Sequence, residues 1–191
     1  LPPIPQEKDI DLLIIGLKEP NLGKALLEKI ETSDIILSQR QSGGESNPAS
    51  RSTRPRARIG TFGESSDLRK SEKIKIHLQL PPKLPTRIDF LRLLARAKTV
   101  CCLPLQADRG AEGFYLPALE AMALDTLVIC PPAVGNRDHC LDGINCIMPE
   151  YDLDTICDAV LKSMTWTAEK RESLIAGGRA TALKHDLQQE R

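Results

Sequence analysis

Short apolar runs separated by amphipathic stretches recur along the chain. Residues 10–16 (IDLLIIG) form a nearly unbroken apolar run, which is typical of a parallel strand covered on both faces. Residues 22–30 (LGKALLEKI) then show helical spacing of apolar positions, and we expect Asn21 to cap this helix. A further apolar run at residues 33–38 (SDIILS) predicts a second strand.

A second series of elements begins at residue 73. Residues 73–80 (KIKIHLQL) alternate between apolar and polar, which indicates a strand with one wetter face. Thr86 followed by Asp89 marks the start of a helix, because this pair can satisfy the first backbone N–H groups. Further strands are expected at residues 99–105 (TVCCLPL) and 126–130 (TLVIC), and further helices at residues 152–164 and 167–187. The alternation predicts an α/β domain, Rossmann-like, with a mainly parallel sheet and flanking helices.

Residues 39–71 differ sharply from the rest of the chain. Ser, Gly, Pro and Arg dominate there, and the stretch RSTRPRAR has no aromatic residue between its arginines. Such a segment buries too little apolar surface to offset the entropy of ordering it. We interpret residues 39–71 as a flexible insertion within a single domain spanning residues 1–191. A phosphate or nucleic-acid contact, or a regulated tail, is the alternative.

Composition narrows the class of protein. A hydrophobic content of 41% is enough for a packed core, and the formal net charge of zero gives no overall field to attract nucleic acid or an anionic membrane. The apolar runs are shorter than the roughly 20 residues that span a bilayer, and no secretory signal is visible at the start. We therefore expect a cytoplasmic domain with no transmembrane segment and no nucleic-acid partner.

The six cysteines do not suggest disulfides or a zinc site. They contain no C-x-x-C pair. Cys101 and Cys102 are adjacent on a predicted strand, so their side chains are expected to point to opposite faces. We expect the thiols to stay reduced.

The candidate chemistry lies in residues 111–124 (AEGFYLPALEAMAL). Pro117 lacks an N–H and fits only the first turn of a helix, so the helix begins near residues 115–117 and Glu112 precedes it in a loop. Glu120 is then one turn into the helix, and both carboxylates can border one ligand at its N-terminus. The N–H groups of residues 113–116 and the helix dipole suit a diphosphate. A diphosphate flanked by carboxylates is expected of a sugar nucleotide.

Residues 111–124 resemble the E-x7-E region of retaining GT-B glycosyltransferases of the family-4 type, whose usual form is EGFGLPALEAMACG. The resemblance continues through residues 126–152, which look like the family's strand, Gly-containing loop and D-G-x-N-G segment. It is good over residues 73–164, weaker over residues 9–30 and absent for the insertion. It implies one half of a GT-B fold, the C-terminal donor-binding domain of an enzyme of hexosyltransferase type that retains anomeric configuration.

The resemblance also assigns roles to single positions. Glu112 matches the glutamate that contacts the donor sugar near its reacting end, and is the catalytic candidate; Glu120 matches the one that binds the ribose hydroxyls. Asp125 stands at a helix end where the family usually has Gly in left-handed geometry. The remaining candidates for binding the donor are the backbone cradle of Gly113, Phe114, Tyr115 and Leu116, the basic residues Lys18 and Lys24 in a loop that lacks the family's Arg, and Asn136 and Arg137.

The resemblance further implies what accompanies this domain. The substrate is a nucleotide-sugar donor, and neither a metal nor another cofactor is expected. The acceptor site belongs to an N-terminal domain that this sequence does not contain, so we expect the chain alone to be an incomplete, inactive fragment. Two alternatives stay open: a non-catalytic GT-B-like binding or interaction module, and a UDP-sugar hydrolase or epimerase.

Overall fold

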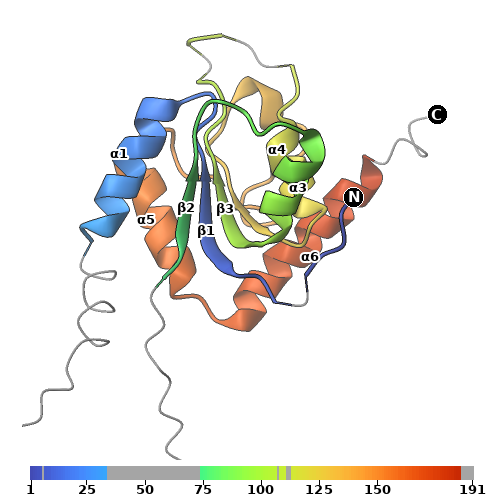
Figure 1. The fold of residues 1–191 in the computed structure, drawn as a ribbon. Coiled ribbons are helices and arrows are strands. Elements are labelled where there is room, and N and C mark those ends of the chain that lie inside the picture. The colour runs from blue at the N-terminus through green and yellow to red at the C-terminus, as the bar shows by residue number, and fades with distance from the viewer. Residues whose placement is uncertain (6, 34–73, 107, 111–112, 186–191) are drawn as a thin grey trace, which may run out of the picture.

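The computed structural model describes residues 1–5, 7–33, 74–106, 108–110 and 113–185 (Figure 1). Within these ranges four parallel strands form one sheet in the order β2-β1-β3-β4. The strands are β1 (Ile10–Ile15), β2 (Ile76–Gln79), β3 (Ala97–Cys102) and β4 (Leu127–Ile129). The predicted parallel sheet is therefore confirmed. The strand expected at residues 33–38, apart from residue 33, and the insertion at residues 39–71 lie outside the described residues.

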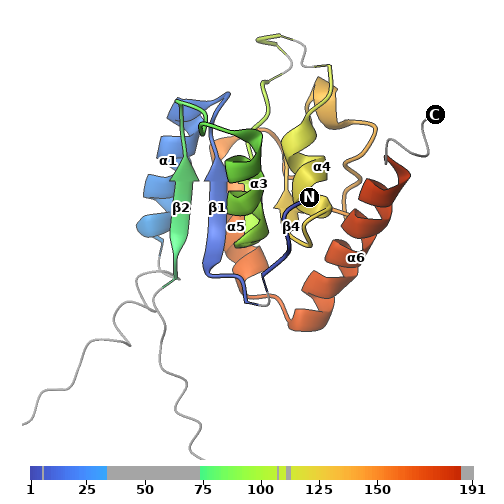
Figure 2. The same ribbon diagram turned by 45° about the vertical axis from the view of Figure 1, so that its right-hand side comes forward.

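Helices cover both faces of the sheet (Figures 1 and 2). Helices α1 (Pro20–Glu31) and α5 (Leu153–Met164) lie on one face, while α3 (Arg87–Ala95) and α4 (Leu116–Met122) lie on the other. Helix α6 (Ala168–Lys184) packs beside α4 and β4. None of the helices in the described part of the chain combines the length and the apolar content that crossing a bilayer requires.

The period of two along each strand explains how both faces are covered. Leu12 and Cys101 pack with α1 and α5, whereas their neighbours Leu13 and Cys102 pack with α3 and α4. The opposite orientation of the two adjacent cysteines is thus confirmed. All six cysteines are buried and free.

The strand order reverses at β1. The chain passes from β1 to β2 through α1 on one face, and from β2 past β1 to β3 through α3 on the opposite face. The loops that follow β1 and β3 therefore diverge from neighbouring strand ends. In open α/β sheets such a reversal leaves a crevice at the carboxyl edge, where ligands bind.

Capping residues fix the helices on both sides of this crevice. The Thr86 hydroxyl accepts the Asp89 N–H at 3.2 Å and donates to the Asp89 carboxylate at 2.7 Å, so α3 begins as predicted. Helix α4 begins at Leu116 with Pro117 in its first turn, which is also as predicted.

The start of α1 differs from the prediction. The helix begins at Pro20, and Glu19 rather than Asn21 occupies the position before it. Proline suits the first helical position because its φ is preset and its missing N–H would have had no partner there. Pro20 is therefore a stronger signal for the start of this helix than Asn21, the residue after it.

The turn between α4 and β4 closes the amino edge of the sheet. Asp125 has a φ of +55°, the left-handed geometry expected at this position, and its carboxylate accepts the Arg179 Nε–H at 2.7 Å. The Lys8 amino group donates to the carbonyls of Ala97 and Leu124 at 3.0 and 2.8 Å, and also to the Thr126 hydroxyl at 2.7 Å. Burial lowers the pKa of Lys8 to about 8, while the nearby Asp125 opposes this shift.

Two glycines let α6 approach the rest of the domain. A Cβ on Gly177 would lie 2.1 Å from the carbonyl oxygen of Ile144, and a Cβ on Gly178 would lie 3.0 Å from the Met122 side chain. Glycine inside a helix costs about 1 kcal/mol relative to alanine, so a glycine pair weakens a helix by propensity alone. Instead the helix continues through both residues, and they bring it against the loop at Ile144 and against α4.

We predict that Gly177→Ala destabilises the domain by about 1–3 kcal/mol, because the added methyl group meets backbone that has little room to shift. Helix propensity alone predicts the opposite sign, since Ala favours a helix by roughly 1 kcal/mol over Gly. Urea unfolding followed by circular dichroism measures the difference. Gly178→Ala should cost less, because its Cβ would be crowded by the Met122 side chain and in ordinary contact with the Asn145 carbonyl at 3.5 Å. A Gly177→Ala midpoint at or above the wild-type value contradicts the packing argument.

Candidate functional site

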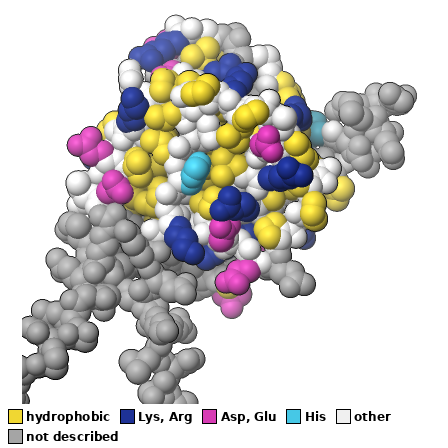
Figure 3. All heavy atoms as spheres, viewed as in Figure 1, with side chains coloured by type: hydrophobic (Ala, Val, Ile, Leu, Met, Phe, Trp, Pro, Cys, Tyr) yellow, Lys and Arg dark blue, Asp and Glu magenta, His cyan; other side chains and the backbone are white. Residues whose placement is uncertain are grey.

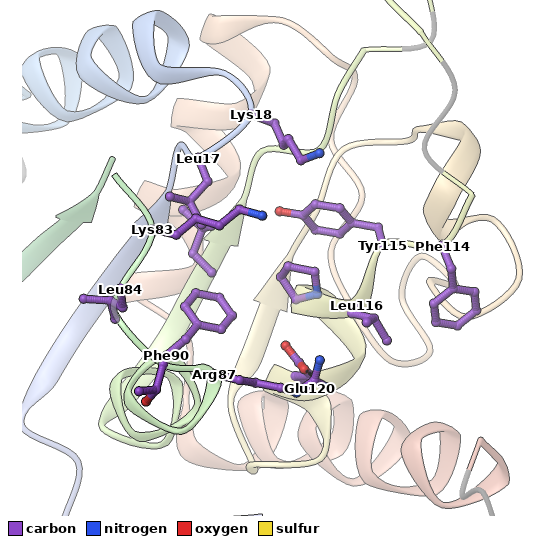
Figure 4. Close-up of a pocket in the computed structure, with 13 residues that line it drawn as sticks. Leu17, Lys18, Lys83, Leu84, Arg87, Phe90, Phe114, Tyr115, Leu116 and Glu120 are labelled. Atoms are coloured by element: carbon purple, nitrogen blue, oxygen red, sulfur yellow. Dashed lines mark ion pairs between the residues drawn. The ribbon is translucent and has the colours of Figure 1, made fainter. Parts of the chain in front are cut away.

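A cavity of about 420 Å³ opens at the carboxyl edge of the sheet, in the crevice beside β1 (Figure 4). Three segments that are far apart in sequence form its wall. They are the end of β1 with the loop after it, the loop between β2 and α3 with the first turn of α3, and the segment leading into α4. The lining residues are Ile15, Leu17, Lys18, Lys83, Leu84, Thr86, Arg87, Phe90, Phe114, Tyr115, Leu116, Pro117 and Glu120.

The wall has an apolar part and a charged part. Leu17, Leu84 and Phe90 present hydrocarbon and an aromatic ring to the cavity, and Lys18 and Lys83 extend amino groups along it (Figure 4). On the face shown in Figure 3, basic and acidic side chains are interspersed among hydrophobic ones. The combination of an apolar wall with a few charged groups is typical of small-molecule sites.

Glu120 supplies the carboxylate of this cavity. It lies one turn into α4, is only 8% exposed, and pairs with the guanidinium of Arg87 from α3. Burial raises the pKa of the Glu120 carboxyl, and the charge of Arg87 opposes that shift. A buried carboxylate facing a cavity can accept hydrogen bonds from hydroxyl groups. The structure thus places Glu120 one turn into α4, on the wall of a ligand-sized cavity.

The loop between β3 and α4 is held at three points. The Tyr151 hydroxyl donates to the carbonyl of Pro104 at the start of the loop. Arg109 then donates to the buried carboxylate of Glu19 at 3.0 Å, in front of α1. Glu112, the catalytic candidate, follows in this loop but lies outside the described residues.

The third point that holds this loop is the Tyr115 N–H, and it corrects one part of the expected backbone cradle. The Tyr115 N–H donates to the carbonyl of Gly135 at 2.6 Å, so it is engaged with protein and does not face a ligand. This bond ties the start of α4 to the loop after β4. Leu116 is the first residue of α4, where an N–H has no partner within the helix. Of these two N–H groups, the one at Leu116 keeps the position that the expected cradle requires.

Gly113 and Phe114 precede the helix and are exposed. The Phe114 ring is 42% exposed and lies 4.6 Å from the buried ring of His139, measured between centroids. Burial lowers the pKa of His139, which favours the neutral imidazole beneath Phe114. A Cβ on Gly113 would meet nothing within 4 Å, so crowding does not require glycine there.

The basic residues predicted to bind the donor do not all lie at the cavity. Lys18 lines the cavity, but Lys24 is exposed on α1 and is not among the lining residues. Arg137 is exposed and also lies outside the lining. The structure thus brings Lys18 and Glu120 to one cavity and leaves Lys24 and Arg137 away from it.

Asn136 has a structural role in its loop. Its side chain is fully buried, its Oδ1 accepts the Ala133 N–H at 2.9 Å, and its Nδ2 donates to the Pro131 carbonyl at 2.9 Å. These bonds shape the loop whose Gly135 carbonyl holds Tyr115. A side chain that is buried and bonded in this way does not reach a ligand, which corrects the expected donor contact.

Sequence reasoning missed the contribution of the loop between β2 and α3. Lys83, Leu84, Arg87 and Phe90 all line the cavity. A signal was available, because Lys83 and Leu84 follow a predicted strand and Arg87 begins a predicted helix, the position where α/β proteins place ligand-binding residues. The resemblance to known enzymes is concentrated in residues 111–124 and assigns no role to this loop.

We predict that Glu120→Gln raises the melting temperature at neutral pH. The folded state holds the Glu120 proton more tightly than the unfolded chain does, so this carboxyl favours folding most at low pH. That contribution is lost as the pH rises through the raised pKa, and the neutral amide avoids the loss. Arg87 is largely exposed and can be solvated without its partner.

Thermal unfolding at about pH 4 and about pH 8 tests this sign, because the interval includes the ordinary carboxyl range. The advantage of the Gln variant over the wild type should grow with pH. A variant that loses stability relative to the wild type as the pH rises would show that the ion pair with Arg87 outweighs the cost of burial.

Comparisons with known proteins identify the family and the fold of this chain. The model of the family described as Glycosyl transferases group 1 matches residues 48–165. The search of curated proteins finds no match. The structure is similar to the C-terminal domain of LpcC, a glycosyl transferase group 1 family protein from Francisella tularensis, with 18% identity and a TM-score of 0.57 over 94% of this chain and 87% of that chain.

Two longer proteins contain a similar domain. A glycosyltransferase from Rickettsia africae is 12% identical with a TM-score of 0.54, over 92% of this chain and 43% of that chain. The N-terminal domain of trehalose-6-phosphate phosphatase from Candida albicans is 11% identical with a TM-score of 0.56, over 95% of this chain and 40% of that chain. This chain thus spans less than half of either, and these similarities establish the Rossmann-like α/β fold. The family model covers more than half of the sequence, and the chain therefore belongs to the glycosyl transferases of group 1.

Proposed function

We propose that the cavity binds the nucleotide-sugar donor of a retaining glycosyltransferase of the family-4 type, and that this chain is its C-terminal domain. The observation that carries the proposal is the position of Glu120. This carboxylate is buried one turn into α4 and shares a cavity wall with two lysines and an aromatic ring. Hydroxyl, phosphate and base of a nucleotide each find a chemically matched group on that wall.

The size and the charge of the cavity support this ligand class. A volume of about 420 Å³ falls within the range of roughly 300–1,000 Å³ common for small-molecule sites. In the proposal Glu120 accepts hydrogen bonds from the ribose hydroxyls, which requires them to share or displace Arg87. The phosphates lie toward the start of α4, where the Leu116 N–H and the helix dipole favour an anion.

The chemistry of the proposed reaction follows the resemblance. Glu112 contacts the donor sugar near its reacting end, and the sugar, a hexose, passes to the acceptor with retention. The charge of the departing diphosphate is met by amides and basic side chains, without a metal ion. An N-terminal domain supplies the acceptor site, so the chain alone binds the donor but transfers sugar poorly. The similarity to a C-terminal domain supports this placement.

Isothermal titration tests donor binding. We expect this chain to bind at least one of UDP, GDP and ADP, or the corresponding nucleotide sugar, because the cavity pairs a buried carboxylate with basic residues. If none of these compounds binds at millimolar concentration, the donor-site proposal fails.

Substitution separates the roles of the two glutamates. Glu120→Ala should weaken nucleoside diphosphate binding about tenfold or more, because it removes charge-assisted hydrogen bonds to the ribose. Glu112→Ala should leave that binding nearly intact and impair transfer in a protein that includes the acceptor domain. Glu28→Ala, on the exposed side of α1, is the matched control. Equal losses of nucleotide affinity in the Glu112 and Glu120 variants contradict the assigned roles.

One observation favours a second candidate, a non-catalytic GT-B-like binding or interaction module. The loop after β1 presents Leu17 and Lys18 to the cavity and contains no Arg, although the resembling enzymes use one there. Such a module binds the nucleotide without turnover in the protein that includes the acceptor domain. A UDP-sugar hydrolase or epimerase is distinguished by its products, which are free sugar or an epimer formed without an acceptor.

A further inference from the structure

Two lysines from different loops converge on one side of the cavity. Lys18 follows β1, and Lys83 lies in the loop between β2 and α3. Figure 4 shows both amino groups extending into the cavity toward the Tyr115 ring, above Phe90 and away from Glu120. Segments that are distant in sequence thus place two positive groups at the same end of the site.

The charges of the wall are unevenly distributed. Among the described residues that line the cavity, Glu120 is the only carboxylate, and it is paired with Arg87 at the opposite end from the lysines. Among the described lining residues, the charged groups at the other end are the two lysines. Both lysines are exposed, and an anionic part of a ligand that enters the cavity is within reach of two ammonium groups, which form charge-assisted hydrogen bonds with phosphate oxygens.

The backbone on both sides of Lys83 is fixed. The buried side chain of Gln79 donates to the carbonyl of Leu80 at 2.8 Å and reaches that of Pro82 at 3.4 Å. Three residues after Lys83, the Thr86 cap starts α3. Lys83 therefore lies in a short loop whose backbone is restrained on both sides. When Lys83 binds an anion, little more than the Lys83 side chain has to become ordered.

We propose that Lys83, together with Lys18, binds the phosphate groups of the ligand. The proposal rests on the donor site described above and names the residue that supplies the positive charge expected of the missing Arg. It also orients the nucleotide, with the ribose at Glu120 and the phosphates extending past the start of α4 toward the lysines.

Lys83→Ala in this chain should weaken binding of inorganic pyrophosphate and of the best-binding nucleoside diphosphate by about tenfold or more, the effect expected from losing one charge-assisted hydrogen bond. Lys83→Glu should weaken both further. Lys75→Ala is the matched control, because Lys75 is an exposed lysine just before the amino end of β2, whereas Lys83 follows its carboxyl end. The control should bind both ligands as the wild type does.

Isothermal titration gives the dissociation constants, and a thermal melt of each variant establishes that it is folded. Nucleoside diphosphate binding that stays within about twofold in Lys83→Ala, or falls equally in Lys75→Ala, overturns the role of Lys83 while the donor site stands. Pyrophosphate binding that depends on Lys83, in a chain that binds no nucleoside diphosphate, supports the anion site and refutes the proposed donor site. A wild-type chain that binds neither ligand overturns both proposals.

Discussion

The direction in which the chain leaves β1 determines where the cavity of this molecule lies. Neighbouring strands β2 and β3 flank β1, and their crossover helices lie on opposite faces of the sheet. Both faces of β1 are consequently covered, which is why Leu12 and Leu13 are equally buried although they point in opposite directions. The loops after β1, β2 and β3 meet at one edge, and the cavity lies among them.

Polar contacts at that edge hold the cavity wall in place. The Asn136 amide shapes the loop after β4, and the Gly135 carbonyl of that loop holds the Tyr115 N–H at the start of α4. Asn145 performs a similar task farther along: its Nδ2 donates to the His139 carbonyl and to the Thr181 hydroxyl of α6, each at 2.8 Å. The start of α4 is therefore held through a loop that is shaped by a buried amide outside the cavity lining. A buried carboxylate such as Glu120 is costly in isolation, and this fixed surrounding keeps it at the wall.

Local rules predicted much of the fold. The apolar runs marked β1, β3 and β4, Thr86 and Pro117 marked the starts of α3 and α4, and the left-handed residue at Asp125 was expected. Each of these depends on a few neighbouring residues. Features that depend on contacts between distant parts of the chain could not be predicted by such local rules. The burial of Asn136, the exposure of Lys24 and the positions of Lys83 and Phe90 at the cavity all depend on how the loops pack. The carbonyl partner of the Tyr115 N–H was equally invisible in sequence.

The most direct test of a nucleotide site at the β1 crevice is amide chemical-shift mapping by NMR while a nucleoside diphosphate is added to this chain. We predict that the shifts concentrate in Lys18, in the loop and helix from Lys83 to Phe90, and in Leu116 to Glu120, three segments that share only the cavity. A second hollow lies on the other side of the sheet near Trp166, lined also by Thr155, Asp158 and Lys162. Shifts confined to that hollow, or no shifts at saturating ligand, would contradict a nucleotide site between α3 and α4.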